Sequence, residues 1–104
     1  METARRLNLN ITVMVWEDGG YGLIGWKQTN EFGRHTDLAF GNPDWVSMAE
    51  SFGWNGHMVP RSEDVQDVLR QSFEEAGPSL IVIPIDYNEN TLLTKRLGEL
   101  SCPI

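Results

Sequence analysis

Two short, nearly continuous runs of apolar residues stand out along the chain, at residues 11–16 and at residues 79–86. Both are rich in valine and isoleucine, a pattern typical of parallel strands that helices cover on both faces. We therefore predict two buried strands at these positions and a third, shorter strand at residues 56–59. Pro84 has no amide proton to donate, so strand pairing beside it should be one-sided or should end there.

A first helix is predicted between these strands, where apolar residues recur at helical spacing. Asn42 is a candidate N-cap, and Pro43 would occupy the first helical position, where its missing amide proton costs nothing. Gly53 should end the helix. The expected apolar stripe consists of Trp45, Val46, Met48, Ala49 and Phe52.

A second helix is predicted to begin at Ser62 and to end before Gly77 and Pro78, a pair that stops helices. Negative charge in its first turn complements the helix dipole. Its buried face is predicted to contain Val65, Val68, Leu69, Phe73 and Ala76. Acidic residues should mark its start and its solvated side, namely Glu63, Asp64, Asp67, Glu74 and Glu75.

The alternation of strands and helices predicts an α/β fold with three layers, in which helices cover both faces of a parallel sheet. Residues 1–7 have the character of a helix end, and residues 90–100 that of a weakly helical tail. A domain rarely begins within a helix, and a sheet of so few strands leaves edges that a larger domain would cover. We therefore expect residues 1–104 to be a single partial domain, with further chain upstream.

Composition and charge narrow the classes of function. The chain of 104 residues has a formal net charge of −7, which disfavours DNA and RNA as partners because their binding depends on lysine and arginine. A single phosphorylated cofactor remains compatible with this charge, since helix N-termini and a divalent metal can hold phosphates.

The cysteine content and the lengths of the apolar runs indicate the compartment of the protein. Cys102 is the only cysteine, so no internal disulfide can form, and no neighbouring base marks it as a nucleophile. No apolar run is long enough to span a bilayer, and the N-terminus lacks the apolar core of a signal peptide. We therefore expect a cytoplasmic protein that does not bind membranes.

Candidate chemistry follows the first predicted strand. Glu17 and Asp18 precede Gly19 and Gly20 at the carboxyl end of that strand, where open α/β sheets bind ligands. Carboxylate and carbonyl oxygens are the ligands that Mg²⁺ prefers, usually together with phosphate oxygens and water. Asp-Gly after a strand more often forms a simple turn, so this segment alone leaves both interpretations open.

A longer series of short motifs indicates a particular family of proteins. In order along the chain they are residues 20–24, 26–28, 40–45, 49–53, 77–80 and 84–87. The series resembles the C-terminal region of thiamine-diphosphate-dependent enzymes, and among these most closely the catabolic acetolactate synthases. The resemblance covers nearly the whole chain, from about residue 2 to about residue 97.

The resemblance implies a cofactor domain that binds thiamine diphosphate together with Mg²⁺. Asp18 would give its carboxylate and Gly20 its backbone oxygen to the metal, and Gly19 and Tyr21 would complete the cofactor-binding segment. Residues of a substrate pocket would follow at Leu23, Ile24, Lys27 and Gln28. For the two aliphatic residues among these, packing beneath a helix is an equally good interpretation.

The activity of the family implies a parent enzyme that decarboxylates pyruvate, a 2-oxo acid, and joins it to a second pyruvate as 2-acetolactate. Such enzymes work as oligomers with sites between subunits, so the resemblance implies a homo-oligomer. The opening Gly-Asp-Gly half of the metal motif is absent from the sequence, as is the domain with the glutamate that activates the cofactor. No catalytic residue is therefore assigned, and the isolated chain should be inactive.

Two alternatives remain open. The parent could be another thiamine-diphosphate-dependent decarboxylase or acetyltransferase, because most of the discriminating residues lie in other domains. The chain could instead be a non-catalytic α/β module that self-associates through exposed sheet edges.

His35 and His57 lack the spacing of metal ligands, so we expect His35 to be an ordinary loop residue and His57 to be a structural strand residue. The four tryptophans should serve the core and interfaces.

Overall fold

The computed structural model of the chain describes residues 1–86. They form two units, of which the larger consists of Met1–Glu17 and Gly41–Pro84 and the smaller contains Asp18–Phe40 with residues 85 and 86. The sheet belongs to the larger unit, and the predicted cofactor and substrate residues belong to the smaller one. The predicted tail at residues 90–100 and Cys102 lie outside the described residues.

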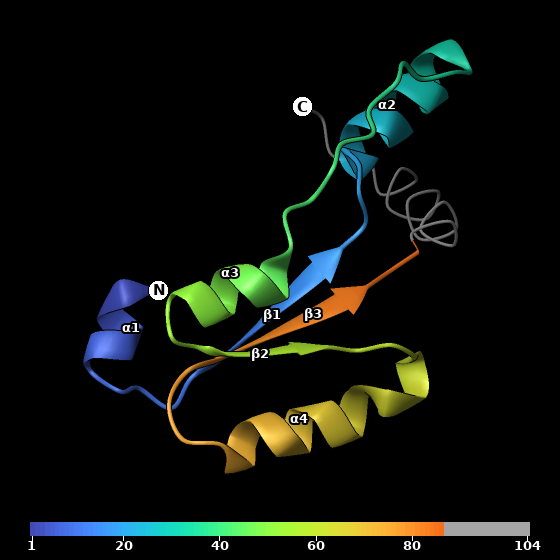
Figure 1. Cartoon of the computed structure of the whole chain (residues 1–104). Helices are drawn as coiled ribbons and strands as arrows, with labels where there is room; N and C mark the ends of the chain where they lie inside the picture. The colour runs from blue at the N-terminus through green and yellow to red at the C-terminus, as the bar shows by residue number, and fades with distance from the viewer. Residues whose placement is uncertain (87–104) are drawn as a thin grey trace, which may run out of the picture. The chain divides into compact units, whose positions relative to one another are not determined.

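The larger unit is built on a three-stranded parallel sheet (Figure 1). Its strands β1 (Thr12–Glu17), β2 (Asn55–Met58) and β3 (Ser79–Pro84) lie in the order β1-β3-β2. All three predicted strands are therefore confirmed, although their ends differ slightly from the predicted ones.

At Pro84 only one neighbouring strand pairs with β3, as the missing amide proton of this proline predicts. β1 pairs with β3 as far as Glu17 opposite Pro84. On the other side of β3, the ladder with β2 already stops at Met58 opposite Val82. Pairing beside Pro84 is therefore one-sided.

Both apolar runs predicted a buried strand, but only the central strand, β3, is buried. Residues 80–83 of β3 are between 0% and 6% exposed. On β1, however, Val13, Met14 and Trp16 are 41%, 40% and 58% exposed, so the predicted burial of this strand is wrong. The reason is its position, because β1 lies at an edge of the sheet and the two helices that cover the faces pack on the other two strands.

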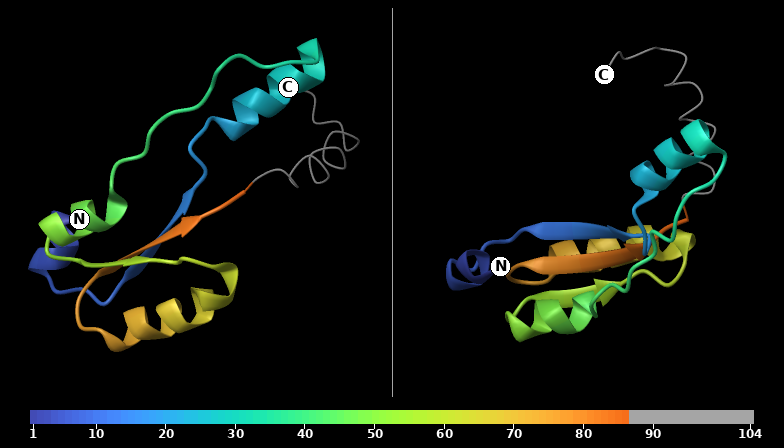
Figure 2. Two further views of the ribbon diagram at one scale, coloured as in Figure 1. Left: turned by 45° about the vertical axis from the view of Figure 1, so that its right-hand side comes forward. Right: turned by 90° about the horizontal axis from the view of Figure 1, so that it is seen from above.

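Helices cover both faces of the sheet (Figure 1 and Figure 2), and the predicted three-layer α/β fold is confirmed. α3 (Trp45–Ser51) packs on β2 and β3 from one face, and α4 (Val65–Glu74) packs on the same two strands from the other. A short helix, α1 (Glu2–Arg6), precedes β1. The main core cluster consists of Ala4, Ala49, Trp54, Leu80 and Val82.

α3 begins later than predicted, because Asp44 and not Asn42 is its N-cap. The Asp44 carboxylate accepts hydrogen bonds from the Ser47 amide at 3.0 Å and from the Ser47 hydroxyl at 2.8 Å. These bonds favour the charged carboxylate and hold the pKa of Asp44 below its ordinary value. Pro43 therefore precedes the helix instead of opening it.

The predicted buried face of α4 is confirmed at Val65, Val68 and Leu69, which are partly buried, but it is wrong at the C-terminal end of the helix. Phe73 is 72% exposed, and Ala76 is exposed beyond the end of the helix, whereas Ser72 is only 3% exposed. Ser72 follows Val65 by seven residues, or about two helical turns. It therefore continues the stripe of α4 residues that faces the sheet, the inward stripe, while Phe73 lies at the edge of this stripe. The Ser72 hydroxyl donates to the Leu69 carbonyl at 2.8 Å, which satisfies this polar group in the interior.

The region around α4 holds one hydrogen-bonded pair that the sequence did not reveal. The predicted helix start is a 3₁₀ turn, η1 (Ser62–Asp64), and α4 follows it directly. Glu75 was expected to be solvated, but its carboxylate lies 2.7 Å from Nε2 of His57, with side chains 31% and 15% exposed. The pair ties β2 to the end of α4, which gives His57 its structural role.

The smaller unit consists of a helix and the segment that returns from it. α2 (Gly22–Phe32) has Tyr21 as its N-cap and ends at Gly33, whose φ of 70° is the left-handed conformation that suits glycine. None of the α2 residues is buried. Within residues 1–86, no helix is long and apolar enough to cross a membrane.

Candidate functional site

The predicted cofactor segment is held in place by the chain that returns from α2. Gly20 forms an isolated antiparallel bridge with this returning segment. Beside the bridge, Tyr21 donates its amide to the Leu38 carbonyl at 3.2 Å, and Phe40 donates its amide to the Gly19 carbonyl at 3.0 Å. The rings of Tyr21 and Phe40 add a tilted contact, with centroids 4.8 Å apart. The segment therefore has a defined backbone although it lies near the surface.

The Asp18 carboxylate turns back over this segment. Its Oδ1 accepts a hydrogen bond from the Gly20 amide at 3.3 Å, as in an Asx turn. Gly19 between them has a φ of 69°, a left-handed conformation that other residues adopt only with strain. A Cβ at Gly22 would lie 3.7 Å from Asp18 Oδ2, so the absence of a side chain there leaves this second oxygen accessible.

The Gly20 carbonyl oxygen takes no part in the bonds that hold this segment, and the Gly20 amide donates to Asp18. The adjacent bonds use Gly19 and Tyr21, and no residue among 1–86 donates to the Gly20 carbonyl. One carboxylate and one carbonyl oxygen are thus available together.

The N-terminus of α2, which follows the cofactor segment in the chain, supplies hydrogen-bond donors. Tyr21 makes no side-chain cap, and the first turn contains no acidic residue. The amides at the start of this 11-residue helix therefore keep their capacity to bind an anion. Oxygen ligands for a cation and amides for an anion are a combination that suits a metal-bound phosphate group.

The protein oxygens of this segment are too few for a complete metal site. Among residues 1–86, no group of three or more His, Cys, Asp or Glu side chains could hold a metal ion. Mg²⁺ needs octahedral coordination, but it commonly takes only one or two carboxylates and completes its shell with phosphate oxygens and water. Asp18 and Gly20 fit such a site as two of its ligands.

The predicted substrate residues lie on two sides of α2. Leu23 and Lys27 are one turn apart and share a side, and Ile24 and Gln28 share another. Leu23 is 68% exposed and Ile24 is 48% exposed, so neither packs beneath a helix in the described chain. Both side chains are therefore open to contact with a ligand or another protein surface.

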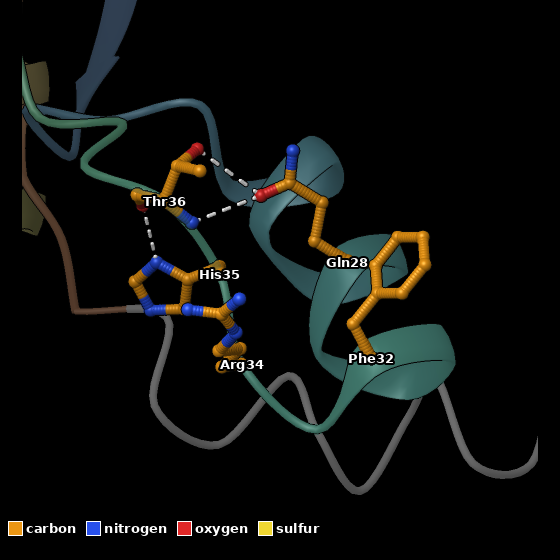
Figure 3. A pocket seen from close by; sticks show the side chains of 5 residues that line it. All are labelled: Gln28, Phe32, Arg34, His35 and Thr36. Carbon is orange, nitrogen blue, oxygen red and sulfur yellow. Dashed lines mark hydrogen bonds between the residues drawn. The ribbon is translucent and has the colours of Figure 1, made fainter.

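Gln28 has a partner that the sequence did not reveal. Its amide oxygen accepts hydrogen bonds from the Thr36 amide at 3.1 Å and from the Thr36 hydroxyl at 3.3 Å (Figure 3). These bonds tie the returning segment to α2, and only the amide nitrogen of Gln28 stays available to a ligand. The spacing of eight residues carries no motif, so no sequence signal marks this contact.

Comparison with known protein families shows the family of the chain and the cofactor of that family. Residues 1–83 match the family described as "Thiamine pyrophosphate enzyme, C-terminal TPP binding domain", where thiamine pyrophosphate is another name for thiamine diphosphate. The chain belongs to this family. The resemblance inferred from the short motifs is thereby confirmed, and thiamine diphosphate is the cofactor of the family.

Several similar proteins are acetolactate synthases. The chain is 39% identical to "Acetolactate synthase" of Bacillus subtilis (strain 168) over 96% of its own length. It is 35% identical to "Acetolactate synthase, catabolic" of Raoultella terrigena over 93% of its length. These matches cover only 18% and 17% of the two relatives, so the chain corresponds to a small part of each.

Proposed function

We propose that this chain is the C-terminal part of the cofactor domain of an acetolactate synthase, with residues 1–104 forming one partial domain. The whole protein would decarboxylate pyruvate and condense it with a second pyruvate to give 2-acetolactate. The observation that carries the proposal is the presentation of Asp18 and Gly20 oxygens before the uncapped start of α2, in a chain of the thiamine diphosphate family. The 39% identity to an acetolactate synthase favours this activity over others of the family.

The proposed role of the cofactor segment is to hold Mg²⁺ against the diphosphate. Asp18 would give a carboxylate oxygen and Gly20 its carbonyl oxygen, while the left-handed turn at Gly19 keeps the two together. Tyr21 would fix the segment through its contact with Phe40, and the first amides of α2 would bind phosphate oxygens. When bound, the cofactor supplies the electron sink for decarboxylation.

The proposed substrate residues border this segment along α2. The exposed Leu23 and Ile24 offer an apolar surface that suits the methyl group of pyruvate. Lys27 has no ion-pair partner among residues 1–86, so its ammonium is free to attract the carboxylate of a 2-oxo acid. Gln28 would contribute its amide nitrogen, because its oxygen is held by Thr36.

We further propose that the parent protein is a homo-oligomer of the cytoplasm. The exposed apolar residues of β1, such as Met14 and Trp16, support this assembly because they need cover from other protein surface. The single cysteine in the sequence is compatible with a reducing compartment.

The test is an activity assay on the longest protein encoded by the reading frame that contains this sequence. With pyruvate, thiamine diphosphate and Mg²⁺, the purified protein is expected to form 2-acetolactate. Asp18→Asn should lower kcat/KM by about tenfold or more and raise the Mg²⁺ requirement. Asp37→Asn is the matched control, because Asp37 accepts the Ala39 amide in a similar turn. Absence of 2-acetolactate from the wild-type protein would contradict the proposed activity.

A further inference from the structure

A small cavity lies toward the C-terminal end of α2, away from Asp18. It has a volume of about 290 Å³ and is lined by Gln28, Phe32, Arg34, His35 and Thr36 (Figure 3). At a rise of ~1.5 Å per residue, roughly 15 Å of helix separates Gly22 from Phe32. The cavity is therefore distinct from the proposed metal site at the start of the helix.

Hydrogen bonds set the polar wall of this cavity. The amide oxygen of Gln28 is fixed by Thr36, as described above. Nδ1 of His35 lies 2.7 Å from the Thr36 carbonyl. A carbonyl can only accept, so Nδ1 carries a proton and donates it, which leaves Nε2 of His35 for a ligand. The wall is thus arranged before any ligand binds.

Arg34 gives the cavity its charge. Among residues 1–86, no carboxylate lines the cavity and none forms an ion pair with Arg34. In a chain with a net charge of −7, an unpaired guanidinium is a local positive charge. A guanidinium binds a carboxylate with two parallel hydrogen bonds, so this chemistry favours an organic acid.

Phe32 gives the same cavity an apolar wall. It is the last residue of α2, and 71% of it is exposed, so its ring is available to a ligand. Pockets for small molecules combine apolar surface with a few polar groups, and a volume of about 290 Å³ is at the lower end of their range. The ligand should therefore be small and should carry an apolar or flat body.

We propose that this cavity binds a small organic carboxylate, with its carboxylate on Arg34 and its apolar body against Phe32. His35 Nε2 would add a polar contact at the rim. Binding at this site needs neither the metal ligands nor acetolactate synthesis, so this proposal and the proposed function can fail separately.

Benzoate is a suitable probe, because it joins a carboxylate to a flat apolar ring. In a titration of the ¹⁵N-labelled chain of 104 residues, benzoate is expected to shift the amide signals of residues 28–36 in a saturable way. Arg34→Gln should weaken this binding by about tenfold, as expected for the loss of a hydrogen-bonded charge. Arg70→Gln on α4 is the matched control, because the Arg70 side chain is 63% exposed and Arg34 is likewise at the surface, and this variant should bind like the wild type.

Three further measurements separate the outcomes. Benzamide has the same shape without the charge and is expected not to bind, and inorganic phosphate, an anion without an apolar body, should bind more weakly than benzoate. Signals outside residues 28–36 should be unchanged in Arg34→Gln, which shows that the variant folds. No response to benzoate, equal binding by the Arg34→Gln variant, or equal binding of benzamide would overturn the proposal. Phosphate binding as tight as that of benzoate would overturn the role of Phe32.

Discussion

The amide oxygen of Gln28 accepts two hydrogen bonds from Thr36, at 3.1 Å and 3.3 Å. This contact fixes the point at which the chain turns back along α2. The returning segment then reaches Leu38 and Phe40, whose backbone bonds hold Tyr21 and Gly19 of the cofactor segment. Within the smaller unit, one side chain on the helix therefore supports both the cavity wall and the strand-like bridge next to Asp18.

Removal of this contact should loosen the returning segment. Gln28→Ala leaves the Thr36 amide and hydroxyl without their acceptor. We expect this loss to lower the free energy of local opening by about 1 kcal/mol. Hydrogen exchange of the Thr36 amide should therefore be about fivefold faster than in the wild type. Gln28→Glu keeps an oxygen acceptor and should change the exchange rate less. Equal exchange in the Gln28→Ala variant would show that the contact does not hold the segment.

The Asp44 cap should contribute to stability in a pH-dependent way. Hydrogen bonds from Ser47 hold the pKa of Asp44 below its ordinary value of 3.8, so the charged form is favoured in the folded state. Its contribution is present above this ordinary value and is lost as the pH falls through the lower folded-state pKa. Asp44→Asn retains a capping oxygen but does not titrate there.

Urea unfolding of the wild type and the Asp44→Asn variant checks this expectation. The wild type should have the larger free energy of unfolding near neutral pH, and the difference should shrink once the pH is below the folded-state pKa of Asp44. Other carboxylates titrate equally in both proteins, so the comparison isolates Asp44. A difference that stays constant over this range would contradict the capping role of the charge.

Gly56 should be intolerant of a side chain because α3 approaches β2 closely there. A Cβ at Gly56 would lie 3.0 Å from Val46 Cγ1 and 3.0 Å from the Val46 carbonyl oxygen. Gly56→Ala should therefore lower the free energy of unfolding by about 1–3 kcal/mol, as overpacking does. Gly41→Ala meets nothing within 4 Å and is the matched control. Equal unfolding free energies of the two variants would contradict this account of the helix–strand contact.

The sequence predicted those features that depend on local pattern. The β-branched run at residues 79–86 indicated a strand buried on both faces, and β3 is the central strand of the sheet. The missing amide of Pro84 predicted one-sided pairing, which the ladder confirms. The order of short motifs indicated the family, and the family model matches residues 1–83.

Features that depend on which surfaces meet could not be predicted in this way. β1 contains an apolar run as β3 does, but strand order places it at an edge and the helices pack on the other two strands, so Met14 and Trp16 are exposed. Phe73 is apolar and close to the inward stripe, yet Ser72 takes the buried position because helical rotation favours it. The contacts of Gln28 with Thr36 and of His57 with Glu75 join residues whose separations carry no sequence signal.

The central claim is that Asp18 and Gly20 form part of a Mg²⁺ and diphosphate site, and one titration tests it most directly. The purified chain is titrated with thiamine diphosphate, with and without Mg²⁺, while the fluorescence of Trp26 in α2 is followed together with that of the other tryptophans. We expect saturable binding that depends on Mg²⁺, is weakened about tenfold or more by Asp18→Asn, and is retained by Asp37→Asn. Binding that ignores Mg²⁺, or no response up to millimolar cofactor, would contradict a working metal site in this segment.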